Sequence, residues 1–369
     1  MLRLWCLLAA SGLGVACAAA EDHWRLQYFL DEDSTALSLR DLKFPSPERG
    51  IAAGELRREG HAQPVVLLTE DSGEHWTQVQ VPEAAQSLFF ASPKLGWMVT
   101  QSGVWGTADG GRNWKRLARL RGLLRLYFLD EAHGWAVGSP KAVFETKDGG
   151  QHWTAVAAAA QPKSTPEFTT YNCLDFTGQR IGLIAGSSRP PRQRSERFPD
   201  WMEPEKAQRS REWPELTIFL ETRDGGQNWR SSVTSMFGVV SQVRLAPDGR
   251  GLGVIRFFEA FQWPAEVFLL NWGTGRSTRV FRRADRDVTD ALLTAEGTAY
   301  LAGIEPAGRL RQLPIPGKLK ILRSRDFLSW EEMPVDYRAV ATHVVLATGG
   351  AGQLWAATDT GMILKLTSQ

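Results

Sequence analysis

The chain has 369 residues, of which 43% are hydrophobic and 23% are charged, so it can bury one large core or two ordinary ones and does not have the composition of a disordered protein. Its 43 lysines and arginines nearly balance its 41 aspartates and glutamates, and this balance excludes a global electrostatic attraction to nucleic acid or anionic lipid. The 15 tryptophans, against five tyrosines, indicate that a periodic source of tryptophan should be sought.

Residues 1–20 have the pattern of a cleaved secretory signal peptide. A single charge, Arg3, precedes an apolar run, and small residues follow it up to Ala20. The sequence therefore predicts export to the periplasm or the cell exterior, with residues 21–369 forming one mature domain. No later run has the roughly 20 apolar residues that a membrane span requires, so we expect no transmembrane segment in the mature chain.

An alternative interpretation takes Cys17 as the lipid-modified first residue of a bacterial lipoprotein, although Gly14 stands where such signals usually carry a branched residue. With cleavage at Ala20, only Cys173 remains in the mature chain. A single cysteine cannot form an internal disulfide, so the fold must be held by packing, and Cys173 is expected to be a small buried hydrophobe.

One phrase recurs along the mature chain: a Thr, an Asp two residues later, a glycine-containing turn and a final Trp. Four clear copies occupy residues 69–76, 107–114, 146–153 and 222–229, and a shortened relative occupies 324–330. Successive aspartates of the clear copies are 38, 39 and 76 residues apart, a period typical of a four-stranded propeller blade. The paired aspartates and tryptophans are Asp71 and Trp76, Asp109 and Trp114, Asp148 and Trp153, Asp224 and Trp229, and Asp326 and Trp330.

The phrase has the chemistry of a tight turn between two strands. Aspartate accepts hydrogen bonds from the amides that follow it, glycine supplies positive φ, and the tryptophan is expected to begin the outer strand. An apolar strand such as 143–146 precedes each copy, and a Gly-Trp strand such as 134–138 precedes that. The unit is therefore an antiparallel blade. Because the aspartates recur in every blade, we interpret them as turn builders and not as catalytic acids.

The count of blades depends on two degenerate copies. Residues 267–275 align with 143–151, with Trp272 at the Asp position and Ser277 at the Trp position, so the turn chemistry of this copy has decayed. Residues 355–365 match the start of a unit whose outer strand is missing, and residues 23–29 can supply that strand. We therefore predict an all-β, seven-bladed propeller of four-stranded antiparallel blades, closed by pairing of the N- and C-terminal strands.

The interval of 76 residues contains one blade and a long insertion at residues 189–215. The insertion is rich in proline and in charges of both signs and has no apolar alternation, so we expect a loop. Arginine and tryptophan dominate many binding surfaces. The candidate partner-binding residues of this loop are Arg189, Arg192, Arg194, Arg197, Trp201 and Trp213.

The Asp-Gly-Gly-x-x-Trp phrase resembles the Asp-box, or bacterial-neuraminidase repeat, of sialidases, some endoglucanases and sortilin-like receptors. Together with the upstream Gly-Trp-x-Val-Gly motif it resembles the photosystem II stability and assembly factor family of seven-bladed propellers and its bacterial relatives. The resemblance is best from about Leu67 to Trp229 and fades beyond Val240. It implies a non-catalytic, exported protein that binds an assembly intermediate of a membrane-protein complex. No short motif of that family's recognition surface can be matched here, so no binding residue is carried over.

Two other functions stay open at this stage. A glycosidase of the sialidase-like Asp-box type needs two suitably spaced carboxyl groups, and a receptor module for sugar or peptide needs only a binding face. The sequence shows no catalytic constellation, no arginine-isoleucine-proline signature and no metal-binding spacing among its six histidines. We therefore expect no enzyme activity, no metal, no cofactor and no nucleic acid partner, and a monomer that binds a membrane-associated protein.

Overall fold

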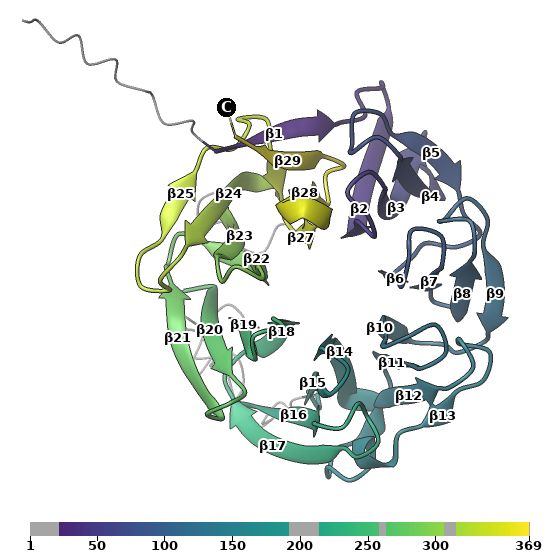
Figure 1. The fold of residues 1–369 in the computed structure, drawn as a ribbon, viewed down its shortest axis with the longest axis vertical. Coiled ribbons are helices and arrows are strands. Elements are labelled where there is room, and N and C mark those ends of the chain that lie inside the picture. The colour runs from purple at the N-terminus through teal and green to yellow at the C-terminus, as the bar shows by residue number, and fades with distance from the viewer. Residues whose placement is uncertain (1–21, 192–213, 258–262, 306–314, 369) are drawn as a thin grey trace, which may run out of the picture.

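Seven antiparallel sheets surround a central axis in the computed structural model, which describes residues 22–191, 214–257, 263–305 and 315–368 (Figure 1). Each sheet contributes one strand next to the axis and one strand at the circumference. The predicted seven-bladed, four-stranded propeller is confirmed. The predicted signal peptide, at residues 1–20, lies outside the described residues.

Blades 1 to 6 follow one another along the chain, each running from the inner strand to the outer strand. Blade 1 consists of β2 (Thr35–Lys43), β3 (Gly50–Arg58), β4 (His61–Thr69) and β5 (Thr77–Gln80). Blade 2 consists of β6 (Ser87–Phe90), β7 (Gly96–Val99), β8 (Val104–Thr107) and β9 (Lys115–Ala118). Blade 3 consists of β10 (Leu123–Phe128), β11 (Gly134–Gly138), β12 (Ala142–Thr146) and β13 (Thr154–Ala155). Blade 4 consists of β14 (Thr169–Thr177), β15 (Ile181–Ser188), β16 (Glu215–Thr222) and β17 (Arg230–Met236).

The remaining strands complete the ring. Blade 5 consists of β18 (Val239–Leu245), β19 (Arg250–Arg256), β20 (Ala265–Asn271) and β21 (Arg276–Arg282). Blade 6 consists of β22 (Asp287–Leu293), β23 (Ala299–Glu305), β24 (Gly317–Ser324) and β25 (Glu331–Met333), with the short β26 (Val340–Ala341) also paired to β24. Blade 7 consists of β27 (Val344–Thr348), β28 (Leu354–Thr358), β29 (Ile363–Thr367) and β1 (His23–Tyr28). The helical turns are the 3-10 segments η1 (Ala157–Ala159), η2 (Pro166–Phe168) and η3 (Gly350–Gly352).

Blade 7 closes the ring by combining the two ends of the described chain. Strand β1 pairs antiparallel with β29, so that Trp24 lies opposite Leu366, and this confirms the predicted closure. The same strand contacts blade 6, because the Trp24 amide donates to the Pro334 carbonyl at 2.9 Å and the Trp24 carbonyl accepts from the Asp336 amide at 3.0 Å. The Trp24 side chain is buried. The seam is therefore held by backbone pairing on both sides of β1.

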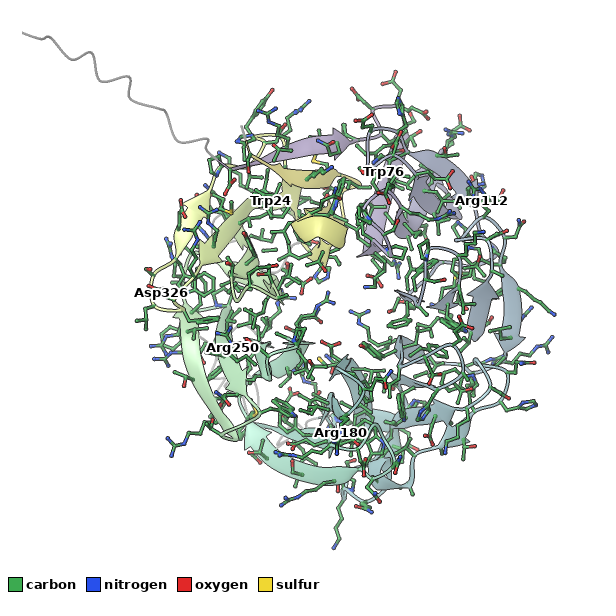
Figure 2. All side chains as sticks on the ribbon, in the orientation of Figure 1. Trp24, Trp76, Arg112, Arg180, Arg250 and Asp326 are labelled. Atoms are coloured by element: carbon green, nitrogen blue, oxygen red, sulfur yellow. The ribbon has the colours of Figure 1, made fainter. Side chains whose placement is uncertain are left out.

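The hydrophobic core lies between adjacent blades, and three of these interfaces share an aromatic arrangement. At the interface of blades 3 and 4, Trp135 of β11 stacks on Phe176 at a centroid distance of 4.7 Å, and Trp229 meets both rings edge-on. We call this arrangement of two indoles and one phenyl ring the aromatic triad. The other complete triads are Trp355, Phe44 and Trp76 between blades 7 and 1, and Trp97, Phe128 and Trp153 between blades 2 and 3. The box tryptophans thus join neighbouring blades (Figure 2 labels Trp76).

The inner strands share a second feature, a shift of register that acts as a β-bulge. In β2, β10, β14, β18 and β22 the pairing slips by one residue near the middle of the strand. A bulge bends the strand and redirects the side chains next to it. The first paired residues after the slip are Asp41, Arg125, Cys173, Gln242 and Asp290, and all five line the central channel.

Candidate functional site

The Asp-box turns lie at the circumference, between the third and outer strands of a blade (Figure 2 labels Asp326). In blade 2 the Asp109 carboxylate accepts from the Thr107 hydroxyl at 2.8 Å, from the Asn113 amide at 2.9 Å and from the Asn113 side chain at 2.8 Å. The Thr107 hydroxyl in turn accepts from the Gly111 amide at 2.9 Å. Both oxygens of the carboxylate are therefore used to build the turn. The outer strand begins one residue after the box tryptophan. The tryptophan therefore ends the turn, whereas the sequence predicted that it would begin the outer strand.

The residue just before each box tryptophan completes this network. His75 and His152 hold Nδ1 at 2.6 Å from the second oxygen of Asp71 and Asp148, where Asn113 and Asn228 place their side-chain amides in other copies. The position varies in residue type, but each of the four residues can donate a hydrogen bond there. The backbone amide of His75, and then its ring, lower the pKa of Asp71 to about 2. The box carboxylates therefore stay ionised at neutral pH and are not proton donors.

One box turn brings potential metal ligands together. Ligand atoms of Asp71, Glu74 and His75 lie within 4.8 Å of one another, and no other group of three or more such ligands occurs among the described residues. The contact between His75 and Asp71 is the same turn contact that His152 makes with Asp148. We therefore assign these residues to the turn.

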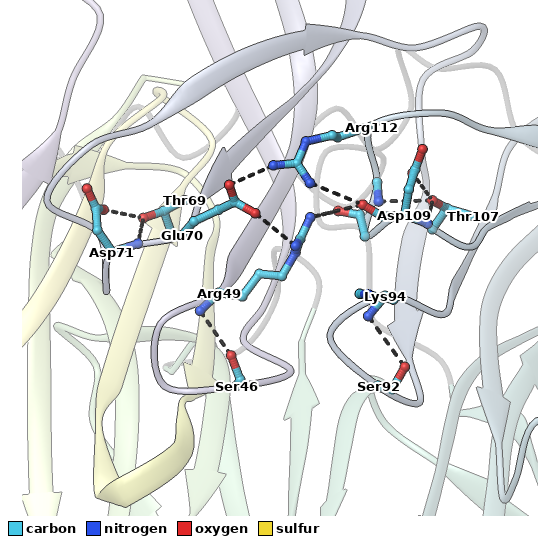
Figure 3. A network of polar contacts seen from close by, with 12 residues as sticks. Ser46, Arg49, Thr69, Glu70, Asp71, Ser92, Lys94, Thr107, Asp109 and Arg112 are labelled. Carbon is cyan, nitrogen blue, oxygen red and sulfur yellow. Dashed lines mark hydrogen bonds and ion pairs between the residues drawn. The ribbon is translucent and has the colours of Figure 1, made fainter.

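Two neighbouring boxes are also linked to each other (Figure 3). Arg49 of blade 1 pairs with Glu70 at 2.9 Å and donates to the carbonyls of Asp109 and Gly110 in blade 2 at 3.0 and 3.1 Å. Arg112 of blade 2 pairs with the other Glu70 oxygen at 2.6 Å. The Arg49 side chain is largely buried by these contacts. At this place, ion pairs and hydrogen bonds thus connect blade 1 to blade 2.

The central channel contains a cavity of about 280 Å³ that is lined by all seven blades. Its charged lining consists of four basic residues, Arg40, Lys43, Arg125 and Arg244, and three aspartates, Asp41, Asp175 and Asp290, with His343 beside them. Burial keeps the pKa of His343 below its ordinary value, so this ring is neutral at neutral pH. The lining therefore carries an excess of positive charge.

The channel aspartates tie neighbouring blades together. Asp41 accepts from the amide of Leu88, in blade 2, at 2.7 Å, and Asp290 accepts from the amide of Leu346, in blade 7, at 2.8 Å. Asp175 accepts from the amide of Leu245, in blade 5, at 2.7 Å. Each of the three also accepts from the amide of the residue that follows it. These carboxylates are thus occupied by structural hydrogen bonds.

The cations of the channel are less fully neutralised. Lys43 pairs with Asp41 at 2.8 Å, and Arg244 reaches Asp290 at 3.4 Å. In contrast, Arg40 donates to the Gln86 side chain at 3.3 Å, and Arg125 donates to the Gln86 carbonyl at 3.2 Å. Within the described part of the chain, neither Arg40 nor Arg125 forms an ion pair with a carboxylate. Arg40 and Arg125 thus both contact Gln86, and neither guanidinium group is paired with a carboxylate.

Burial raises the pKa of two further groups in the channel lining. The Asp175 carboxyl has a pKa of about 6, because the cost of burying its charge exceeds the stabilisation by Arg244 and by its amide donors. The Cys173 thiol has a pKa of about 12, again because of burial, and it is 2% exposed. Cys173 is therefore an inert buried residue, as expected from the sequence.

The predicted loop surface is described only at its base. The Arg189 Nε group donates to Glu215, and the two residues lie where β15 and β16 meet the loop. The other five candidate residues, Arg192, Arg194, Arg197, Trp201 and Trp213, lie outside the described residues. The structure therefore brings together the channel residues, which sequence reasoning missed, and leaves the loop prediction as it stood.

Comparison with known proteins places the chain beside one group of propellers. Residues 119–190 match the family model described as photosynthesis system II assembly factor YCF48. The photosystem II assembly lipoprotein Ycf48 of Synechococcus sp. (strain CC9902) is 28% identical over 148 residues, which cover 36% of this chain and 43% of that relative. The matched segment thus spans less than half of the relative's length.

Two solved structures are similar over nearly the whole chain. YCF48 bound to D1 peptide has a TM-score of 0.59 at 17% identity, covering 94% of this chain and 96% of that one. YCF48 from Cyanidioschyzon merolae has a TM-score of 0.60 at 16% identity, covering 93% and 98%. The predicted resemblance is confirmed: the chain is a β-propeller that is similar to Ycf48 in part of its sequence and in its fold. Glycoside hydrolases of the GH74 type share the propeller fold as well, so the fold alone does not decide the function.

Proposed function

We propose that the chain is a non-catalytic, exported binding protein that assists the assembly of a membrane-protein complex by holding a polypeptide segment of one subunit at the central channel. The Ycf48 similarity supports the assembly role, and one of the similar structures has a peptide bound. The observation that carries the site is the pair of guanidinium groups of Arg40 and Arg125 on the channel wall. Arginine recognises carboxylates with strong charge-assisted hydrogen bonds. The segment that fits is therefore one with an acidic side chain or a terminal carboxylate.

The carboxylates of the channel favour binding over glycoside hydrolysis. A glycosidase needs one carboxyl group that donates a proton and a second that attacks or activates water. Asp175 has a raised pKa, but its two oxygens accept from the amides of Phe176 and Leu245 at 3.0 and 2.7 Å. Asp41 and Asp290 are engaged in the same way. We therefore propose that the carboxylates brace the ring and that the cations bind the ligand.

Pull-down from gently solubilised membranes of the native host tests this proposal. The mature wild-type chain is compared with the double variant Arg40→Gln and Arg125→Gln, and with the control variant Arg121→Gln, which changes an exposed arginine on a turn. We expect a defined membrane protein to be retained by the wild type and by the control, and its affinity for the double variant to fall by about tenfold or more. Equal retention by all three proteins contradicts the channel site. Recovery of no membrane protein by the wild type contradicts the assembly role.

The insertion at residues 189–215 is proposed as a second contact for the same partner, through the arginines and tryptophans that the sequence singles out. A variant that replaces residues 192–213 with a short Gly-Ser linker tests it in the same pull-down. We expect retention to weaken while the circular dichroism spectrum stays that of the wild type. Unchanged retention shows that the loop is not a contact.

We further propose that the protein is exported and reaches the membrane surface. In the described part of the chain, the structure contains no helix with the length and apolar character that a membrane crossing requires. The similar Synechococcus protein is a lipoprotein by name. Mass spectrometry of the protein purified from its host separates the two forms. A lipid-modified Cys17 at the N-terminus supports anchoring, and a free N-terminus at Glu21 supports simple signal cleavage.

A further inference from the structure

A second cavity, of about 370 Å³, lies between blades 4 and 5. Its walls are formed by the facing sides of β15 and β16 in blade 4 and of β19 and β20 in blade 5. The apolar part of the lining includes Phe219, Ile255, Phe268 and Leu270, all of them partly exposed.

The cavity lies where the aromatic triad is missing. Three positions carry Trp135, Phe176 and Trp229 at the interface of blades 3 and 4. The strand pairings identify the equivalent positions at the next interface. Trp135 lies opposite Glu145 in the pairing of the second and third strands of blade 3, and Leu183 lies opposite Glu221 in the same pairing of blade 4, so Leu183 is the equivalent of Trp135. The corresponding residues between blades 4 and 5 are Leu183, Leu245 and Ser277. At the matched positions, two indoles and a phenyl ring are thus replaced by two leucines and a serine, while Trp272, from the turn before β21, lines the cavity and packs against the cluster that contains Leu183.

The side chains at the triad positions leave part of this interface unfilled. Leu245 still packs against the glycine that begins the next strand, at 3.0 Å from a Cβ placed on Gly251, as the triad phenyl rings do in the other blades. Ser277, in contrast, lies on the exposed part of β21 and supplies no ring to the interface. Gly253 leaves further space on the facing strand, and it also lines the cavity. Interiors are normally packed to crystal-like density, so a gap of this size means that the rings lining it, Phe219, Phe268 and Trp272, do not fill the interface.

The edge of the cavity is charged. Arg223 and Arg276 are exposed and line its edge together with Glu221. Within the described residues, neither arginine forms an ion pair with a carboxylate. The edge therefore has two cations and one carboxylate, and it favours a ligand with negative charge beside its apolar group.

We propose that this cavity, the triad pocket, binds an aromatic side chain of a partner polypeptide, inserted where the box tryptophan stands at the sister interfaces. The occupant is a tryptophan or phenylalanine next to acidic residues, because the sister interfaces hold aromatic rings in this place and the edge is basic. The inference rests on the proposed function in taking the ligand to be a polypeptide. An aromatic anchor in an apolar pocket, surrounded by charged residues, is the usual centre of a tight interface.

The first test uses small probes and does not require the partner. Binding of N-acetyl-tryptophanamide and of N-acetyl-leucinamide to the mature chain is measured by ligand-observed NMR titration. We expect the tryptophan probe to bind the wild type at least about fivefold more tightly than the leucine probe. Ser277→Trp restores the box tryptophan and is expected to weaken binding of the tryptophan probe by about tenfold or more, whereas Ser277→Ala leaves it unchanged. Leu183→Trp fills the pocket from another strand and serves if Ser277→Trp does not fold.

Two outcomes overturn the pocket assignment: equal binding of the two probes by the wild type, or equal binding of the tryptophan probe by Ser277→Trp and Ser277→Ala. The pull-down of the preceding subsection then separates this inference from the proposed function. A partner that is retained equally by wild type and by Ser277→Trp contradicts the triad pocket and leaves the channel site standing. Probe binding by the pocket without capture of any membrane protein contradicts the proposed function and shows that the pocket alone recognises aromatic rings.

Discussion

Replacing Trp135 with alanine is expected to lower the free energy of unfolding by about 3–5 kcal/mol, the usual range for removal of a buried tryptophan. The Trp135 side chain is completely buried, stacks on Phe176 at 4.7 Å and meets Trp229 edge-on at 6.0 Å. Two aromatic pairs contribute about 0.5–1.5 kcal/mol each beyond area burial. Gly226 cannot fill the gap, because it is held at a φ of +84° by the box turn and lies against the indole. Urea unfolding followed by far-UV circular dichroism measures the loss.

The matched control is Leu183→Ala, which changes the equivalent residue of blade 4. Leu183 lines a cavity that already exists, so its removal loses the transfer free energy of one leucine and enlarges the gap, and we expect a cost of about 2–3 kcal/mol. The measured difference between the two variants tests whether the triad stabilises the ring. A Trp135→Ala cost below about 1 kcal/mol, or a Leu183→Ala cost as large as that of Trp135→Ala, refutes the reasoning.

Four further perturbations follow from the structure. Asp41→Ala leaves the buried Leu88 amide without its acceptor, and urea unfolding is expected to show a loss of about 3 kcal/mol, with Asp41→Asn losing less. Three box carboxylates have a pKa of about 2 in the folded chain against 3.8 ordinarily, so their contribution to stability is present above about pH 4 and is lost as the pH falls toward 2; a urea midpoint that does not fall over this range contradicts the assignment. The pKa of Asp175 is instead raised, to about 6, so ionisation of this carboxyl lowers the stability of the fold increasingly as the pH rises from about 4 through 6. Asp175→Asn is expected to remove this decrease from the profile of stability against pH. Trp24→Ala is expected to cost about 3–5 kcal/mol and to increase hydrogen exchange first in β1 and β29; uniform loss of protection in all blades argues against a local seam.

The blade count and the closure of the ring were predictable because turn chemistry repeats. The box phrase needs an acceptor, glycines with positive φ and a large apolar ring at set positions, and these leave an unmistakable period in the sequence. The degenerate copy around Trp272 was placed correctly, because β20 and β21 flank it as the alignment requires. The closing strand was found because one blade lacked a strand at one end of the chain and a strand was spare at the other.

The channel residues were missed for a physical reason. The box turns repeat the same residues from blade to blade, whereas the matched inner-strand positions that line the channel carry Asp41, Arg125, Cys173, Gln242 and Asp290, so no one residue type recurs in every blade. A signal did exist. In blades 1 to 4 a phenylalanine stands six residues before the glycine near the start of the second strand, and the channel residue precedes that phenylalanine by three in each case. The bulge that turns these side chains toward the axis arises from the pairing of two strands, so it cannot be predicted from the sequence of either strand alone.

The triad pocket was also within reach of the alignment but not of its interpretation. Placing Ser277 at the tryptophan position identified a decayed turn, yet the loss became a cavity only because Leu183 and Gly253, on two other strands, fail to compensate. The packing at this place depends on side chains from three strands of two blades. The sequence repeat aligns each strand separately and does not show how their side chains fill the space between them.

The seam between β1 and β29 makes the finished ring depend on two strands that lie far apart in the sequence. The Thr367 hydroxyl donates to the His23 carbonyl across 344 residues of chain, and the Ser368 hydroxyl donates to the Asp22 carboxylate across 346. Blades 1 to 6 can each form from neighbouring segments as they leave the ribosome, whereas β1 has no strand to pair with until β29 has been synthesised. A polypeptide cut short before residue 363 leaves one sheet with an open edge, a target for proteolysis and aggregation. The geometry thus makes closure of the ring depend on the presence of β29.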